Sequence, residues 1–549
     1  MRVYEAIGET LKRLGVDTVF GLIGSGNFGI VSHMTEKCGV THHASRHEGA
    51  AIAMADGYAQ VTGKVGVCTV HQGPGVTNTL TALTESVKNR TPVLLLAGNT
   101  ATTALYQNLD VDQDAVVSSV GAGVEQIRSA DTTVEDIARA VRRAKIERRP
   151  MVVSIPIDIQ EQTCEAEDPP AFVEAQISAS SPSEEAVSRV VDLLESTHRP
   201  VIIAGRGAAL AAARPHLEGL GDRIGALFAT SAAAKGFFAG SPFDLGVSGG
   251  FASPLAVRLI GEADVVLSFG ASLNTWTNKH GNLFSPSTRI VHCDVEASAI
   301  GRIQPVTLGV VGDAAKTADA LLQELVRRNA RLEGFRTDDA IQDIEEFRWE
   351  NDFEDESTEG TVDPRSVLMA LDEILPEERT VAVDCGHFQG FPSRHLSVPD
   401  AAGFVPAWGF QSVGLGMGAG MGAAVARPDR LAVVVIGDGG LLMSLGEIDA
   451  AIHLGVPMVI VVMNDAGYGA EVHHFRSLDL PTDIARFKGS DFTAIATAMG
   501  GKGLVVRSLG DLAQLEEWLE APESIMVVDC KVNPWVEGDF LKEAFVAEA

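Results

Sequence analysis

The stretch of residues 431–475 constrains the fold of this chain more than any other. Two apolar runs, 431–436 and 456–463, flank a segment with a helical period, and each run ends in a glycine-rich polar cluster. Short apolar runs bounded by glycine, with a helical segment between them, are typical of a parallel β-α-β unit. The stretch therefore predicts a parallel sheet that is covered by helices.

The polar cluster after each run contains one aspartate. Asp438 follows the first run in the order Gly-Asp-Gly-Gly, and Asp465 follows the second in the order Asn-Asp-Ala-Gly. Ligands of parallel sheets bind at the carboxyl ends of the strands, so both aspartates are expected to face one site. Carboxylates are hard oxygen ligands for an ion such as Mg²⁺, which commonly bridges to a phosphate. Glycines let backbone N–H groups approach that phosphate closely.

Composition narrows the class of protein. The chain has 549 residues, of which 46% are hydrophobic and 21% charged, which fits a globular protein with several full cores. A formal net charge of -30 argues against nucleic acid as a partner. The six cysteines are scattered singly and form neither a metal pattern nor a disulfide framework. With no signal-like start and no apolar run near the ~20 residues that span a bilayer, we expect a cytoplasmic protein without membrane contact.

Alternating strand and helix signals predict three doubly wound α/β domains with mostly parallel sheets. A polar stretch at 160–182 and an acidic stretch at 338–359 separate them, which gives domains at 1–165, 183–337 and 361–549. The strands expected in the first two domains are 18–23, 64–70, 92–97, 150–154, 201–204, 226–230, 264–269 and 289–293.

A glycine-rich turn offers a different interpretation of the first domain. Residues 24–29 match the G-x-G-x-x-G dinucleotide fingerprint, which would make the protein a nicotinamide-dependent dehydrogenase. That fingerprint also requires an acidic residue at the end of the next strand. Glu48 has the right distance but is expected at a helix start, so an ordinary glycine-rich turn is favoured and the dehydrogenase is a remote alternative.

Several motifs together resemble one enzyme superfamily. Gly437-Asp438-Gly439 followed after roughly 25 residues by Asn464-Asp465 resembles the thiamine-diphosphate motif, although family members usually end in Asn-Asn. The segments 46–48, 56–59 and 73–78 resemble the acetolactate synthase, benzoylformate decarboxylase and pyruvate decarboxylase group. The resemblance covers nearly the whole chain and implies a pyrimidine-binding, a central and a diphosphate-binding domain, in that order.

The resemblance assigns roles to residues far apart in the sequence. It implies that Glu48 hydrogen-bonds the aminopyrimidine of thiamine diphosphate and favours its imino tautomer. It implies that Asp438 and Asp465 hold Mg²⁺ by their side chains and Gly467 by its carbonyl. The other cofactor-binding positions that it implies are Gly386, His387, Val413 (the apolar wedge under the bent cofactor), Gly437, Gly439, Gly440 and Tyr468. FAD is not predicted.

Three further polar residues set the expected reaction. Ser25 and His71 match catalytic residues of benzoylformate decarboxylase, and Glu471 matches an active-site glutamate of pyruvate decarboxylase. Such groups suit proton transfer near neutral pH. The resemblance implies decarboxylation of a small 2-oxo acid, after which the enamine is protonated to an aldehyde or added to a second carbonyl.

The alternative is an acetolactate-synthase-like carboligase, which residues 73–78 support and which uses an aldehyde or a second oxo acid as acceptor. Family precedent also implies a homodimer at least, and a homotetramer by preference, with each cofactor between two chains.

Overall fold

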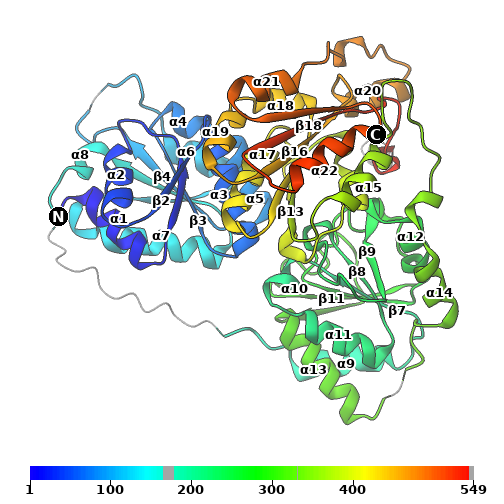
Figure 1. The fold of residues 1–549 in the computed structure, drawn as a ribbon. Coiled ribbons are helices and arrows are strands. Elements are labelled where there is room, and N and C mark those ends of the chain that lie inside the picture. The colour runs from blue at the N-terminus through cyan, green and yellow to red at the C-terminus, as the bar shows by residue number, and fades with distance from the viewer. Residues whose placement is uncertain (105, 165–177, 331, 543–549) are drawn as a thin grey trace.

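Three parallel six-stranded sheets, each covered by helices, make up the chain (Figure 1). The computed structural model describes residues 1–104, 106–164, 178–330 and 332–542. Each pair of neighbouring strands in the described sheets runs parallel. The predicted α/β class with three doubly wound sheets is therefore confirmed. We call the three sheets with their helices the first, second and third domains.

The first sheet has the strand order β2-β1-β3-β4-β6-β5. Its strands are β1 (Thr18–Gly21), β2 (Thr41–Ala44), β3 (Gly66–Val70), β4 (Val93–Asn99), β5 (Gly123–Gln126) and β6 (Met151–Pro156). Its helices are α1 (Val3–Arg13), α2 (Phe28–Glu36), α3 (Glu48–Thr62), α4 (Pro74–Thr77), α5 (Leu80–Asn89), α6 (Gln113–Ser119), α7 (Thr133–Glu147) and α8 (Ile157–Gln160).

The second sheet has the order β12-β11-β10-β7-β8-β9. Its strands are β7 (Pro200–Ala204), β8 (Leu227–Thr230), β9 (Asp244–Val247), β10 (Val265–Phe269), β11 (Arg289–Asp294) and β12 (Leu308–Val311). Its helices are α9 (Glu184–Leu194), α10 (Arg206–Leu210), α11 (Arg214–Ile224), α12 (Pro254–Gly261), α13 (Ala314–Arg327) and, from the acidic stretch, α14 (Asp338–Glu346). The predicted linker at 160–182 falls largely on 165–177, which lie outside the described residues.

The third sheet has the order β14-β13-β15-β16-β18-β17. Its strands are β13 (Arg379–Asp384), β14 (Phe404–Ala407), β15 (Leu431–Gly437), β16 (Met458–Asn464), β17 (Lys502–Val506) and β18 (Ile525–Lys531). Its helices are α15 (Pro364–Ile374), α16 (Gly390–His395), α17 (Gly416–Ala426), α18 (Asp438–Met443), α19 (Glu447–Leu454), α20 (Gly469–Ser477), α21 (Phe492–Met499) and α22 (Ala513–Leu519). The segment between the two apolar runs thus contains two helices, α18 and α19, and not one.

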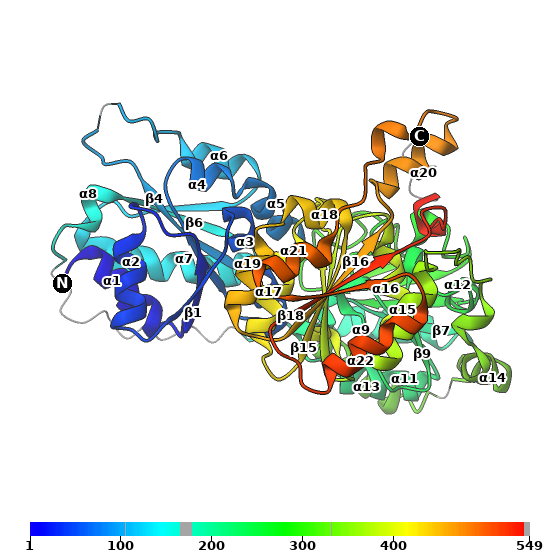
Figure 2. The same cartoon turned by 45° about the horizontal axis from the view of Figure 1, so that its top comes forward.

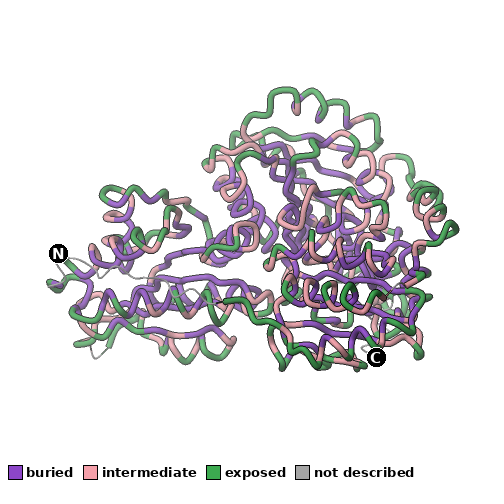
Figure 3. Tube along the Cα trace, turned by 90° about the horizontal axis from the view of Figure 1, so that it is seen from below, coloured by how far each residue is buried: buried purple, intermediate pink, exposed green. Residues whose placement is uncertain are grey.

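In the first two domains, strand prediction failed at the sheet edges. The strands β2, β5, β9 and β12 were not predicted, and each of them is the outermost strand of its sheet. Central strands are buried on both faces and therefore appear as continuous apolar runs. The edge strands are only partly buried, as in β2, whose sequence Thr-His-His-Ala has no buried residue. Figure 3 shows buried residues in the interior of the molecule and exposed residues at its periphery.

Helices α3 and α17 pack against each other and join the first domain to the third (Figure 2). Glycines allow this close approach. A Cβ atom at Gly57 would lie 2.2 Å from the carbonyl oxygen of Ala419, and one at Gly422 would lie 1.9 Å from that of Met54. One hydrophobic core continues across the contact, from Ile52 of α3 to Met421 of α17.

We expect Gly422→Ala to lower the melting temperature. Alanine favours a helix by about 1 kcal/mol over glycine, but its methyl group would overlap the Met54 backbone, and overpacking typically costs about 1–3 kcal/mol. The matched control is Gly219→Ala in α11, where the nearest atom to a new Cβ lies 3.7 Å away. That variant should gain stability. A higher melting temperature for Gly422→Ala would contradict the close approach of α3 and α17 at this position.

Candidate functional site

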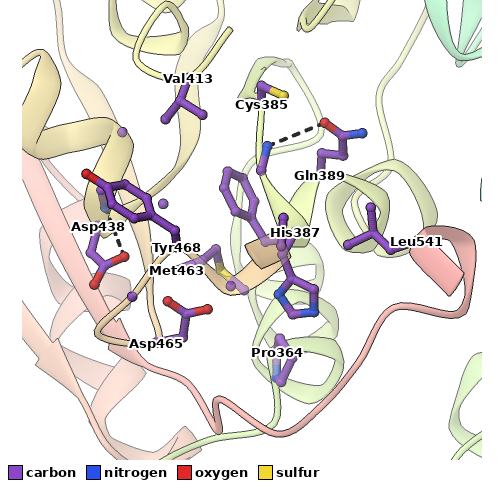
Figure 4. Close-up of a pocket in the computed structure, with 18 of the residues that line it drawn as sticks. Pro364, Cys385, His387, Gln389, Val413, Asp438, Met463, Asp465, Tyr468 and Leu541 are labelled. Atoms are coloured by element: carbon purple, nitrogen blue, oxygen red, sulfur yellow. Dashed lines mark hydrogen bonds between the residues drawn. The ribbon is translucent and has the colours of Figure 1, made fainter. Parts of the chain in front are cut away.

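A cavity of about 250 Å³ lies at the carboxyl ends of β13, β15 and β16 (Figure 4). The loops that follow these strands supply most of its wall. Every cofactor or metal residue predicted in the third domain lines it, together with Glu471. The lining residues among these are Gly386, His387, Val413, Gly437, Asp438, Gly439, Gly440, Asp465, Gly467, Tyr468 and Glu471.

Asp438 and Asp465, which the β-α-β pattern predicted at one edge of the sheet, both line this cavity. Strands β15 and β16 pair in parallel with Gly437 opposite Met463, so the residue after each strand faces the same cavity. Asp438 is 1% exposed, and its Oδ1 accepts a hydrogen bond of 2.9 Å from the Gly439 N–H. Its Oδ2 is buried and has no hydrogen-bond partner among the described residues.

Two carboxyl groups in this cavity are costly to ionise without a cation. Burial raises the pKa of Asp438 to about 6. Burial and the neighbouring charge of Asp438 raise the pKa of Asp465 to about 8. A divalent cation between them would offset both effects. Two carboxylates and a backbone carbonyl, such as that of Gly467, form an all-oxygen donor set of the kind that Mg²⁺ prefers. The residues present therefore fit a magnesium ion.

Glycines line the wall of the cavity next to the two aspartates, where the packing of neighbouring side chains leaves no room for a Cβ atom. A Cβ at Gly440 would lie 2.3 Å from Asp384 Oδ2, and one at Gly439 would lie 2.8 Å from the Tyr468 ring. At Gly469 it would lie 2.3 Å from Asp465 Oδ2. Backbone free of side chains beside the two aspartates suits a diphosphate, whose oxygens accept hydrogen bonds from N–H groups. The cavity thus fits the metal-bound end of thiamine diphosphate.

Asp384 holds the turn that carries Val413. It is fully buried, and its carboxylate accepts hydrogen bonds from the N–H groups of Gly414, Leu415 and Gly416, at 2.8–3.1 Å. These bonds fix the start of α17 and place Val413 on the cavity wall (Figure 4). The sequence motif indicated the nearby Gly386 and missed this role of Asp384.

The ring of His387, on the cavity wall, lies beside the ring of His473 of α20 at a tilt of 31°. The rings of His387 and His473 have centroids 4.4 Å apart. Burial, and to a lesser extent the nearby His473, lower the pKa of His387 to about 3, so its ring is neutral near pH 7. The Gly538 N–H donates a hydrogen bond of 3.4 Å to its Nε2. A neutral, hydrogen-bonded histidine shapes the cavity here without adding charge.

The second domain also reaches the cavity, through Trp276. Its ring stacks on Phe251, with centroids 5.2 Å apart. No motif in the sequence indicated Trp276, because it approaches the third domain only after the domains have packed.

The predicted catalytic residues of the first domain lie elsewhere. Ser25, Glu48 and His71 are all described, and none of them lines this cavity. Glu48 is the first residue of α3, and its Oε2 accepts a hydrogen bond of 2.9 Å from Asn78 Nδ2. His71 Nδ1 accepts one of 3.0 Å from the Gly26 N–H, beside the exposed Ser25. The predicted site residues of this chain therefore fall into two groups, one in the first domain and one in the third.

Two buried glutamates connect the first and third domains. Glu85 of α5 accepts hydrogen bonds from the Gly409 N–H (2.7 Å) and the Phe410 N–H (2.6 Å). Glu447 of α19 accepts them from the Arg46 N–H, at 3.0 and 3.2 Å. Burial outweighs these bonds and raises the pKa of Glu85 and of Glu447 to about 7.

These glutamates make stability depend on pH. Between the ordinary pKa of 4.5 and the folded pKa of about 7, Glu85 keeps a proton in the folded chain that it loses on unfolding. The free energy of unfolding should therefore fall as the pH rises across that window and level off above it. Glu85→Gln should remove part of this slope. The difference in melting temperature, variant minus wild type, should therefore increase from pH 5 to pH 7.5. The exposed Glu516→Gln should not change the profile, and equal slopes in all three proteins would contradict the prediction.

Comparison with known families gives three matches in sequence order. Residues 1–116 match the thiamine pyrophosphate enzyme N-terminal TPP-binding domain, residues 187–321 match the central domain, and residues 384–530 match the C-terminal TPP-binding domain.

Curated relatives align over most of the chain. A sulfoacetaldehyde acetyltransferase of Rhodobacter capsulatus is 28% identical, over 94% of this chain and 91% of its own length. An acetolactate synthase large subunit of Parasynechococcus marenigrum is 28% identical, over 84% and 76% respectively. A probable 2-ketoarginine decarboxylase of Pseudomonas aeruginosa is 29% identical, over 94% and 91%. The described residues include no helix long and apolar enough to cross a membrane.

Proposed function

From the premise that this chain belongs to the thiamine pyrophosphate enzymes, we propose that it is a Mg²⁺- and thiamine-diphosphate-dependent decarboxylase of a 2-oxo acid. The observation that carries the proposal is the convergence of Asp438 and Asp465 beside a glycine-lined wall, in the cavity that Glu471 also lines. When bound there, the cofactor supplies the nucleophilic carbon and the electron sink that decarboxylation needs.

The chain's own residues would divide the remaining work. Asp438, Asp465 and the Gly467 carbonyl hold the cation, and Gly439 and Gly440 present N–H groups to the diphosphate. Val413 would contact the cofactor from the cavity wall, and Glu48 would hydrogen-bond the aminopyrimidine and favour its imino tautomer. Ser25, His71 and Glu471 would bind the substrate and exchange protons with the fragment that remains after CO₂ leaves.

A panel of 2-oxo acids with product identification tests the proposal. We expect release of CO₂ and of the matching aldehyde from at least one acid, dependent on both Mg²⁺ and thiamine diphosphate. A protein that binds the cofactor but turns over none of the acids would contradict the decarboxylase.

Carboligation is the second candidate, and the similarity to an acetolactate synthase supports it. In that case pyruvate alone, or pyruvate with an aldehyde, should yield a carbon–carbon coupled product in place of free acetaldehyde. The same panel separates the two outcomes.

We further propose that a second copy of the chain completes the site. The separation of the predicted site residues into two groups within one chain supports this. Exposed apolar side chains near each group also support it: Phe28 (62% exposed) is next to the turn with Ser25, and Met443 (59% exposed) is at the end of α18. A homodimer would be the smallest active form, and a homotetramer would be two such dimers.

Mixing two inactive variants tests the shared site. In a symmetric dimer, each site would take Glu48 from one chain and Asp438 from the other. A mixed dimer of Glu48→Gln and Asp438→Asn chains then has one site with both substitutions and one site with neither. Random exchange of subunits should restore about one quarter of the wild-type activity. Activity that stays at the level of the single variants, despite subunit exchange verified by mass, would place both residues in a site within one chain.

A further inference from the structure

Three potential metal ligands meet where α1 packs on α2, away from the cavity described above. They are Glu9 of α1, His33 of α2 and Cys38, just after the end of α2. One ligand atom from each lies within 4.8 Å of the other two. The side chain of His33 is 14% exposed, that of Glu9 is 34% exposed, and Cys38 is buried.

Two of the three distances already resemble those between the ligands of a tetrahedral ion. His33 Nε2 lies 3.2 Å from Glu9 Oε1, and Cys38 Sγ lies 3.7 Å from the same oxygen. Around Zn²⁺, with bonds of about 2.0–2.3 Å to nitrogen, oxygen and sulfur, neighbouring tetrahedral ligands are roughly 3.3–3.7 Å apart.

The backbone brings these side chains together. The Cys38 N–H donates a hydrogen bond of 3.3 Å to the His33 carbonyl oxygen, which turns the end of α2 back on itself. Gly8 of α1 leaves room for both side chains, since a Cβ there would lie 3.0 Å from His33 Cδ2 and 3.5 Å from Cys38 Sγ. His33 also borders a surface depression with Glu5, Ser32 and Glu36, so an ion and a water molecule can reach the cluster.

We propose that Glu9, His33 and Cys38 bind a zinc ion, with a water molecule as the fourth ligand, and that the ion fastens the end of α2 to α1. Thiolate, imidazole and carboxylate are the ligand types that Zn²⁺ accepts, and three of them leave one position open. Binding replaces the thiol proton of Cys38, which passes to solvent. Because α2 begins just after the turn with Ser25, the ion would also stiffen the support of that turn.

Cobalt(II) is the probe, because a thiolate–cobalt bond gives a charge-transfer band in the near ultraviolet. The full chain is first treated with a chelator and then saturated with Mg²⁺ and thiamine diphosphate, which occupies the oxygen-lined cavity. We expect the band to saturate at one cobalt per chain and to disappear when zinc is added. If the three residues only hydrogen-bond to each other, no charge-transfer band should appear. The absence of the band in the wild type would overturn the proposal.

Variants locate the site. Cys38→Ser should lose the band, and His33→Asn and Glu9→Gln should bind cobalt more weakly. Glu36→Gln, in the same depression, should match the wild type. A band that persists in Cys38→Ser would overturn the proposal, because it would come from another cysteine. Zinc should also raise the melting temperature of the wild type and not that of His33→Asn; equal shifts in the two would overturn the proposal even if Cys38→Ser folds poorly.

Discussion

Glu48→Gln is expected to fold normally, to bind the cofactor and to lose turnover by about 100- to 10,000-fold, the usual range for removing a group that directs proton transfer. Glutamine keeps an oxygen that can accept the hydrogen bond from Asn78. It removes only the negative charge that the aminopyrimidine needs. At the first position of α3 that charge contributes about 0.3–1 kcal/mol to stability, so the melting temperature should change little.

The measurements for Glu48→Gln are CO₂ release from the best 2-oxo acid, circular dichroism, and the rise in melting temperature with Mg²⁺ and thiamine diphosphate. Glu184→Gln is the matched control, because Glu184 is also the first residue of a helix, α9, and is exposed. It should retain full activity. Turnover of Glu48→Gln at the wild-type level would show that Glu48 does not activate the aminopyrimidine as proposed.

Asp438→Asn is expected to affect the melting temperature in opposite directions, depending on whether Mg²⁺ and thiamine diphosphate are absent or present. Without metal, the substitution removes the buried one of two neighbouring carboxyl groups. Because burial and the Asp438 charge raise the pKa of Asp465 to about 8, removing that charge makes Asp465 easier to ionise. The metal-free variant should therefore melt at or above the wild-type temperature near pH 8.

With Mg²⁺ and thiamine diphosphate, the same variant should show little or no rise in melting temperature and no measurable turnover. Loss of a residue that merely supports a metal ligand costs about 10- to 100-fold in affinity, so loss of a ligand should cost at least about 100-fold. Asp429→Asn, an exposed aspartate just before β15, should behave like the wild type in both states. A normal cofactor-induced shift in Asp438→Asn would show that the diphosphate end binds without this carboxylate.

Local patterns in the sequence were enough to place Asp438 and Asp465 at one edge of the third sheet. The apolar runs that become β15 and β16 predicted two neighbouring parallel strands, and parallel strands carry their following loops to one edge. The strand pattern alone therefore placed Asp438 and Asp465 together. Edge strands such as β2 could not be predicted, because partial burial requires no apolar run.

Contacts between domains left no local signal. Trp276 reaches the cavity from the second domain, and Glu85 holds the loop at Gly409 from the first. Neither residue belongs to one of the motifs described above, because each makes its contacts with a different domain. Asp384 lies close to the predicted Gly386, but its bonds to the N–H groups at the start of α17 join positions some thirty residues apart.

The sequence by itself determined three parallel α/β sheets and the position of Asp438 and Asp465 at one sheet edge, because strand period and glycine-bordered loops are local properties. Only the tertiary structure decided that Ser25, Glu48 and His71 do not line the cavity that holds Asp438 and Asp465 in the same chain. The physical reason is the packing of α3 on α17. Glycines such as Gly57 and Gly422 permit that close contact, and it sets how the first domain is placed against the third.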